Sequence, residues 1–309
     1  MGAVTKTPDP YDPCYCHSGK KYKFCHYPLD KASGIERLKI SLRTYLERWK
    51  ANAENFRSQG CYEWMASQIQ PFQPKRVLDI GCGDGSGIIA LSSILKSPQI
   101  LSLDDNRECL EHARDRCVSG GLKPDCIDRF VVSAQGQSHL ISTAHSKFRF
   151  ESQITLIEGD LLWDKDLLEF ILALPKFDAI TVWLLGTYDI KMECSNTAHL
   201  RAFSEVGKYR HLSHERMYQL AGQILKPGGL IHIVERGISI DADKLREMSV
   251  EEHSDLSAGT GLLLQAYAMR NYTEASGTNR VTMENRHSAN SAVQSQTPLA
   301  LSSIISVKG

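Results

Sequence analysis

An apolar run that leads into glycines at alternate positions occupies residues 77–87, which read VLDIGCGDGSG. The run predicts a strand over 76–80, and the stretch 88–95 after the glycines predicts a helix. Glycines let the backbone turn sharply and leave no Cβ between it and a ligand. The turn therefore predicts an α/β domain that binds a nucleotide-like ligand.

The spacing of these glycines argues against a dinucleotide. A dinucleotide fingerprint places its third glycine three residues after the second. Here Gly83 is the second glycine, Ser86 stands three residues later, and Gly85 comes too early. We therefore do not expect NAD to be the ligand.

Short apolar runs alternate with helical stretches from residue 76 onward, as is typical of a parallel sheet with crossover helices. A run at 127–133 competes with 154–158 for the third strand, and we prefer the later one because Gly159 and Asp160 follow it. Residues 120–150 otherwise fit no element, and the polar stretch 275–298 is interpreted as a long loop. The seven predicted strands are 76–80, 99–103, 154–158, 179–185, 230–234, 262–269 and 301–307.

Acidic residues follow the second and third predicted strands. Asp104 comes directly after the apolar residues of 99–103, so we expect it, rather than Asp105, to accept hydrogen bonds from two ribose hydroxyls. Asp160 is placed to accept from the exocyclic amine of adenine. No Lys or Arg stands out beside these acids, which favours a positively charged ligand over phosphates. Two alternatives to this ligand remain open, namely a related nucleoside-like compound and a site that has lost its ligand.

With these residues, positions 60–309 resemble the class I S-adenosylmethionine-dependent methyltransferase family. The matching pieces are the turn 79–85, Asp104, Gly159-Asp160, the strand 177–181 and the segment 225–229, which reads LKPGG. The resemblance implies a Rossmann-like seven-stranded methyltransferase sheet, parallel with a terminal antiparallel strand. The cofactor contacts it implies are Asp79, Gly81, Cys82, Gly83, Gly85, Asp104, Asp105, Gly159, Asp160 and Leu161.

A second motif lies near the N-terminus, where Cys14 and Cys16 are followed by the adjacent pair Cys25-His26. Three thiolates and one imidazole satisfy a tetrahedral Zn²⁺ with no open position, which indicates a structural ion. The segment resembles the SEC-C zinc motif, a family in which such knuckles dock partners, although His17 stands where that motif usually has glycine. Ordinary reduced cysteines in a disordered tail are the competing interpretation.

The remaining features divide the chain into a zinc knuckle (1–30), a connecting amphipathic helix (31–59) and a methyltransferase domain (60–309). Residues 1–58 contain eleven Lys and Arg against six acids, while the whole chain has 36 of each sign. The basic N-terminal part is therefore the candidate surface for a protein or RNA partner. The nine cysteines and the absence of a long apolar run predict a cytoplasmic protein without membrane association.

The sequence identifies a catalytic group only weakly. Methyl transfer from a sulfonium depends mainly on alignment, and a base matters only when the acceptor is protonated. Tyr188, at the exit of the fourth predicted strand, and His211 are the preferred candidates, with His214 and Glu235 among the others considered. The leading hypothesis is a methyltransferase of unknown acceptor, and the alternative is a non-catalytic S-adenosylmethionine-sensing adaptor that binds a partner through the knuckle.

Overall fold

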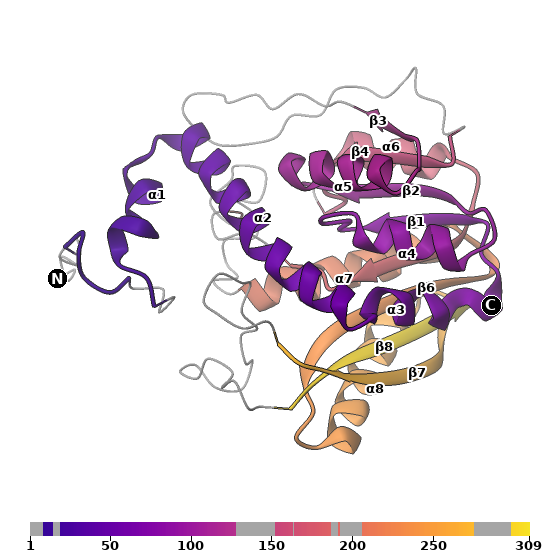
Figure 1. The fold of residues 1–309 in the computed structure, drawn as a ribbon. Helices are drawn as coiled ribbons and strands as arrows, with labels where there is room; N and C mark the ends of the chain where they lie inside the picture. Colours follow the sequence, from indigo (N-terminus) through magenta and orange to yellow (C-terminus); the bar gives the residue numbers. More distant parts are fainter. Residues whose placement is uncertain are drawn as a thin grey trace.

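The computed structural model describes residues 9–14, 19–127, 152–162, 164–186, 191, 206–274 and 298–309. A central sheet with helices on both faces makes up most of the molecule, and a small N-terminal unit joins it through one long helix (Figure 1). Within the described ranges, no helix has the length and apolar character needed to cross a membrane.

Over the described residues, the sheet has eight strands in the order β3-β4-β2-β1-β5-β6-β8-β7. The strands from β3 to β6 in this order are parallel, and β8 lies antiparallel between β6 and β7. The strand bounds are β1 Arg76–Ile80, β2 Gln99–Asp104, β3 Pro124–Ile127, β4 Ile154–Glu158, β5 Phe177–Trp183, β6 Leu225–Ile238, β7 Leu262–Tyr272 and β8 Leu299–Lys308. The sheet is thus the expected Rossmann-like one, and its antiparallel strand is the last strand of the chain, β8.

The expected count of seven strands was wrong. The eighth strand is β3, which pairs in parallel with β4 at the edge of the sheet. Its four residues begin with Pro124 and none of them is buried, so they carry no apolar pattern. Pairing with β4, rather than a local signal, makes this segment a strand.

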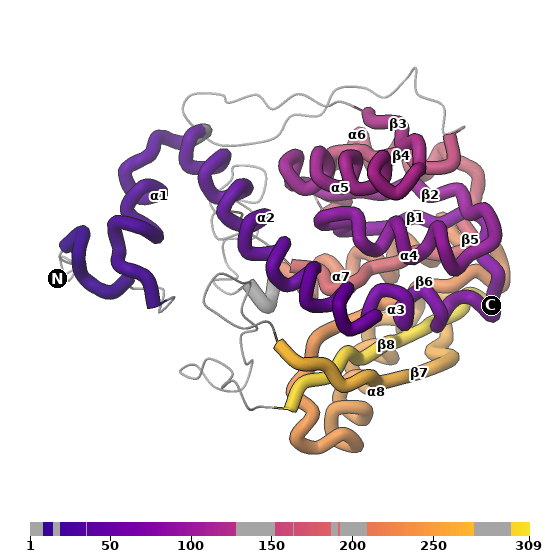
Figure 2. Tube along the Cα trace, in the orientation of Figure 1, coloured from indigo at the N-terminus to yellow at the C-terminus, as the bar shows by residue number. Residues whose placement is uncertain are grey.

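Two hydrophobic layers cover the two faces of the sheet. Val77 of β1 packs into the layer under α2 to α5, whereas its neighbour Leu78 packs into the layer under α6 and α7. This alternation follows from the two-residue period of a strand. Figure 2 traces the backbone of the helices and strands in the orientation of Figure 1. The helices beside the sheet are α3 Cys61–Ile69, η2 Gln70–Phe72, α4 Ser86–Ile94, α5 Arg107–Ser119, α6 Lys165–Ala173, α7 Val206–Ile224 and α8 Ala242–Ser257.

The N-terminal unit contains η1 (Tyr22–Phe24) and α1 (Tyr27–Lys31), and the long helix α2 (Gly34–Ser58) connects it to the sheet. Leu29 of α1 packs against the first turns of α2 in a small apolar cluster of its own. The second half of α2 belongs to the main core, in which Trp49 is 6% exposed and Phe56 is fully buried. One helix therefore takes part in both units.

Candidate cofactor pocket

The glycine turn lies between β1 and α4, at the carboxyl edge of the sheet. Gly81, Gly83 and Gly85 all have positive φ, which glycine adopts without strain. A Cβ on Gly83 would lie 2.5 Å from Nε1 of Trp49, and one on Gly85 would lie 2.8 Å from Cα of Ala113. These glycines are therefore needed for the close approach of α2 and α5 as well as for the turn.

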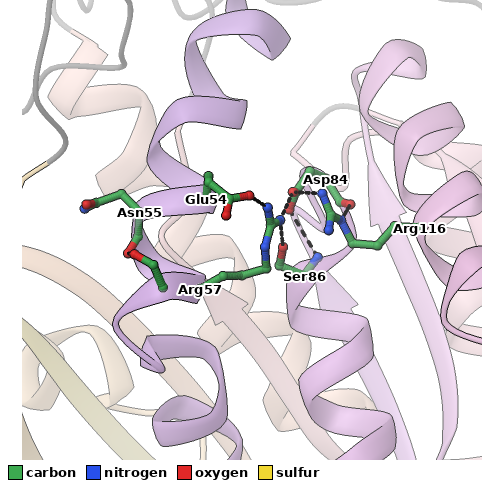
Figure 3. Close-up of polar contacts among 7 residues, drawn as sticks. Glu54, Asn55, Arg57, Asp84, Ser86 and Arg116 are labelled. Carbon is green, nitrogen blue, oxygen red and sulfur yellow. Dashed lines mark hydrogen bonds and ion pairs between the residues drawn. The ribbon is translucent and has the colours of Figure 1, made fainter.

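An ion pair fixes α2 and α5 to this turn. The carboxylate of Asp84 is 2% exposed and lies 2.8 Å from guanidinium nitrogens of both Arg57 and Arg116 (Figure 3). The other carboxylate oxygen accepts from the backbone N–H of Ser86, at the start of α4. A phosphate group would take this helix N-terminus in a dinucleotide-binding protein, but here an aspartate occupies it. The contact supports the prediction that the ligand is not a dinucleotide.

A cavity opens beside the turn, with an empty volume of about 770 Å³ that includes some open solvent. It combines apolar and aromatic walls with a few acidic groups. The lining residues are Tyr45, Trp49, Ile80, Gly81, Gly83, Leu103, Asp104, Asp105, Gly159, Asp160, Leu161, Leu184, Leu185, Gly186, Tyr209, Ser213 and Met217.

Asp104 ends β2 and lines this cavity, at the place expected for a ribose-binding acid. Its two carboxylate oxygens accept backbone N–H groups of Gly83 and Asn106, each at 2.9 Å. The pKa of Asp104 is raised to about 7, mainly by burial and secondly by the nearby negative charge of Asp105. Each oxygen keeps a second lone pair for a hydroxyl donor. The side chain is therefore held in place and still able to accept hydrogen bonds from a ligand.

The acidic rim contains a cation that the sequence analysis did not anticipate. Nζ of Lys191, which is 1% exposed, lies 2.7 Å from Oδ2 of Asp160 and also contacts Asp105. The hydroxyl of Tyr209 donates to the same oxygen of Asp160. Burial alone would raise the pKa of Asp160. The charge of Lys191 and these hydrogen bonds outweigh burial and hold that pKa below its usual range. The expectation that no Lys or Arg stands beside the acids was wrong, because Lys191 is distant from them in sequence.

Three of the ten residues expected to contact a cofactor lie away from the cavity lining. The carboxylate of Asp79 is buried between strands, where it accepts from Ser102 at 2.6 Å and from Thr181 at 2.8 Å. Cys82 is buried in the main core, and Gly85 approaches α5. Their roles as cofactor contacts stay predictions, while the structure assigns Asp79 and Gly85 clear packing roles.

Several lining residues were absent from the sequence-based set. Tyr45 and Trp49 come from α2, where their spacing of four matched the apolar face of the helix and gave no separate signal of function. Tyr209 comes from α7. Leu184 has a φ of 56°, an unfavourable value for a branched side chain, at the exit of β5. Its position in the sequence gives no hint of that strain.

The structure describes one of the two catalytic candidates and places it away from the cavity lining. Tyr188 lies outside the described ranges. His211 lies on α7 with a half-exposed side chain that contacts Glu252 of α8 at 3.4 Å. The neighbouring positions Tyr209, Ser213 and Met217 are those that line the cavity. A catalytic role for either candidate stays a prediction.

The N-terminal knuckle brings three of its four expected metal ligands together. Sγ of Cys14 lies 3.2 Å from Nδ1 of His26, and Sγ of Cys25 lies 3.4 Å from the same nitrogen. A bridge between Pro13 and Lys21 closes the turn that carries Cys14. Cys16 lies outside the described residues. A sulfur about 2.3 Å and a nitrogen about 2.0 Å from a tetrahedral Zn²⁺ are about 3.5 Å apart, so the observed spacing fits this ion.

Comparison with solved structures finds several methyltransferases. TrmN from Thermus thermophilus is 13% identical over 80% of this chain, with a TM-score of 0.42, and the match covers 48% of TrmN, about half its length. A precorrin-6y C5,15-methyltransferase from Geobacter metallireducens is 17% identical, with 81% of this chain and 88% of that one covered and a TM-score of 0.42. An O-methyltransferase from Bacillus cereus in complex with SAH is 12% identical, with 82% and 81% covered and a TM-score of 0.41.

No protein-family model and no curated protein matches this chain. The identities to the solved structures are too low for any residue role to be carried over from them.

Proposed function

We propose that this chain is an S-adenosylmethionine-dependent methyltransferase. The observation that carries the proposal is the cavity beside the glycine turn, where Asp104 stands at the tip of β2 beneath an aromatic wall from α2. In an open α/β sheet, ligands bind outside the carboxyl ends of the strands, where strand order reverses, and β1 and β5 meet at such a point. Asp104, together with the aspartate that occupies the N-terminus of α4, suits a nucleoside without phosphates, such as a sulfonium nucleoside.

In this proposal the protein mainly positions the reactants. The acceptor's lone pair forms a bond to the methyl carbon, the carbon–sulfur bond breaks, and its electron pair stays on sulfur. Asp104 would hold the ribose, and the walls formed by Trp49 and Leu161 would hold the remainder of the nucleoside. Alignment of this kind is worth effective molarities of about 10⁵ M or more.

Calorimetric titration with S-adenosylmethionine and with its demethylated product tests the proposal. We expect both compounds to bind and Asp104→Ala to lose most of the heat. Asp178→Asn is the matched control, because Asp178 lies at the amino end of β5, where it accepts the backbone N–H groups of Lys75 and Arg76. Absence of binding to the wild-type chain would overturn the proposal.

Turnover separates the enzyme from a sensing adaptor. Incubation of the chain with methyl-labelled cofactor and fractionated cell extract should give a labelled product. Cofactor binding without a labelled product in any fraction would favour the non-catalytic adaptor that binds a partner through the knuckle.

We also propose that Cys14, Cys16, Cys25 and His26 hold a structural Zn²⁺. The supporting observation is the convergence of Cys14, Cys25 and His26 described above. Arg48 of α2 donates to Sγ of Cys25 at 3.8 Å and would offset part of the thiolate charge. Metal analysis of protein purified without chelator should find zinc, and Cys25→Ser should contain one equivalent less than the wild-type chain.

The surface of the knuckle is the candidate docking site for a partner or substrate. Tyr11 and Phe24 are 63% and 69% exposed, and Nζ of Lys23 lies 4.0 Å and 4.4 Å from their ring centroids. Aromatic rings interleaved with lysines suit an acidic protein or RNA. Anisotropy titrations with single-stranded RNA and with an acidic peptide test this surface, and Lys23→Glu should weaken whichever of them binds.

A further inference from the structure

Two histidines and one glutamate from three elements meet behind one wall of the cavity. His214 comes from α7, Glu235 from β6 and His253 from α8. Nε2 of His253 lies 3.2 Å from Oε2 of Glu235, and Nδ1 of His214 lies 3.6 Å from Oε1. All three ligand atoms lie within 4.8 Å of one another. Two nitrogen or oxygen ligands, each about 2.0–2.1 Å from a tetrahedral ion, are about 3.3–3.4 Å apart, so the two distances from Glu235 are close to those around one ion.

The cluster is buried and one of its donors is left without a hydrogen bond. His214 is 1% exposed and His253 is fully buried. Within the described part of the chain, no group forms a hydrogen bond with Nδ1 of His214, and its nearest charged group is the carboxylate of Glu235. A buried polar nitrogen normally has a partner because an unmet one costs about 1–3 kcal/mol. A metal ion between His214 and Glu235 would supply that partner.

A tyrosine sets the orientation of the second histidine. The hydroxyl of Tyr218 lies 3.0 Å from Nδ1 of His253 and 3.3 Å from the hydroxyl of Ser306. When Nδ1–H of His253 donates to Tyr218, the lone pair of Nε2 points toward Glu235. Metal-binding histidines typically have their other ring nitrogen fixed in this way.

The charges around the cluster are nearly balanced. Nε of Arg210 lies 3.5 Å from Oε1 of Glu235, with a side chain that is 30% exposed. Glu252, which contacts His211, places a second carboxylate on the α8 side of the cluster. A divalent ion would therefore meet two carboxylates and one guanidinium.

We propose that His214, Glu235 and His253 form a second metal site, distinct from the N-terminal knuckle, which takes Zn²⁺. Two imidazoles and a carboxylate are ligands that zinc accepts, and three protein ligands leave one coordination position open. Ser213 and Met217, on the adjacent face of α7, line the cofactor cavity. The ion would thus fix the wall of the cavity against β6 and α8.

Cobalt substitution of the full chain tests this site, because the two sites differ in ligand chemistry. Co²⁺ bound by thiolates shows a near-ultraviolet charge-transfer band, whereas Co²⁺ bound by imidazole and carboxylate shows only visible ligand-field bands. The Cys25→Ser chain, stripped of metal and titrated with Co²⁺, should bind one equivalent with the second type of spectrum. Double variants that combine Cys25→Ser with His253→Asn or with Glu235→Gln should not bind this equivalent of cobalt.

Glu215→Gln in the same background is the matched control, since Glu215 follows His214 on α7 and its carboxylate accepts from Gln219 instead. This variant should keep the cobalt spectrum. Because a variant can also fail by unfolding, circular dichroism and melting temperature are measured with and without Zn²⁺. The Cys25→Ser chain should melt at a higher temperature with Zn²⁺, and its Glu235→Gln derivative should not respond. A Cys25→Ser chain that binds no cobalt, or whose spectrum survives both cluster substitutions, would overturn the proposal.

Discussion

At the scale of single residues, three aspartates near the glycine turn have three different environments. Asp79 joins β1 to its two neighbouring strands through Ser102 and Thr181. Asp84 joins α2 and α5 through two arginines. Only Asp104 lines the cavity. The sequence singled out Asp104 at its strand tip, but it gave no sign of the packing roles of Asp79 and Asp84.

The raised pKa of Asp104 predicts a pH-dependent affinity for the cofactor. Ribose hydroxyls donate to the ionised carboxylate, whereas below about pH 7 the empty site is increasingly protonated. Binding must then displace a proton, so the dissociation constant should rise about tenfold for each pH unit below about 6 and level off above about 8. Calorimetry between pH 5 and pH 9 measures this, and Asp104→Asn should flatten the profile. A wild-type profile without this slope would contradict the prediction.

Lys191→Met should destabilise the protein in a pH-dependent way. The pKa of Asp160 is lowered in the folded chain, so its pairing stabilises the fold above the unfolded pKa of about 3.9 and is lost as pH falls through the folded value. We expect a loss of about 3 kcal/mol at pH 7 that shrinks below about pH 4. Urea unfolding at pH 7 and at a pH below about 4 measures this loss in the free energy of unfolding. In the Asp160→Asn background the same substitution should cost much less.

At the scale of elements, α2 is part of the cavity as well as a link between units. Its residues Tyr45 and Trp49 form part of the lining, and Arg57 holds the end of the helix to the glycine turn. The backbone oxygen of Leu42 also accepts from Nδ2 of Asn106, next to Asp104. A change in the position of α2 would therefore alter the cavity directly.

Two glycine substitutions test the packing of α2 on the turn. Gly83→Ala and Gly228→Ala both place a Cβ at positive φ, at about 1–2 kcal/mol each. Only the first also meets Trp49, because nothing lies within 4 Å of a Cβ at Gly228. Gly83→Ala should thus lose a further 1–3 kcal/mol or so by urea unfolding. Trp49→Phe should recover part of that excess, and equal losses for the two variants would show that α2 does not press on the turn.

At the scale of the whole molecule, the long helix α2 joins the N-terminal unit to the sheet. The N-terminal unit lies beyond one end of α2, away from the sheet (Figure 1). Its apolar cluster of Leu29, Leu38 and Leu42 is too small to fold alone. A metal ion is the expected source of its remaining stability.

Removal of zinc with a chelator should therefore loosen the N-terminal unit and leave the sheet intact. Tyr22 is 1% exposed and its hydroxyl donates to Asp30 at 2.8 Å. The segment from Tyr22 to Asp30 is therefore packed in the N-terminal unit, and its amide protection measures how well that unit is folded. Hydrogen exchange followed by mass spectrometry should show lost protection over residues 20–31 and unchanged protection in β1 and β5. Unchanged exchange in the knuckle, or a general loss across the sheet, would contradict the prediction.

The sequence by itself indicated seven of the eight described strands along the chain and the place of the glycine turn. It also determined that Asp104 stands at a strand tip. These features depend on local periodicity and backbone sterics, which a short stretch of residues sets on its own. The strand β3 was missed because its four residues pair with β4 without any apolar pattern.

Only the tertiary structure decided which side chains share the cavity and which carry charge into it. Lys191 reaches Asp160, Trp49 covers Gly83, and His214 meets Glu235 and His253 across long sequence separations. Such contacts depend on how helices pack on the sheet. No local pattern in the chain encodes them, because each partner's own neighbours in sequence are compatible with many other placements.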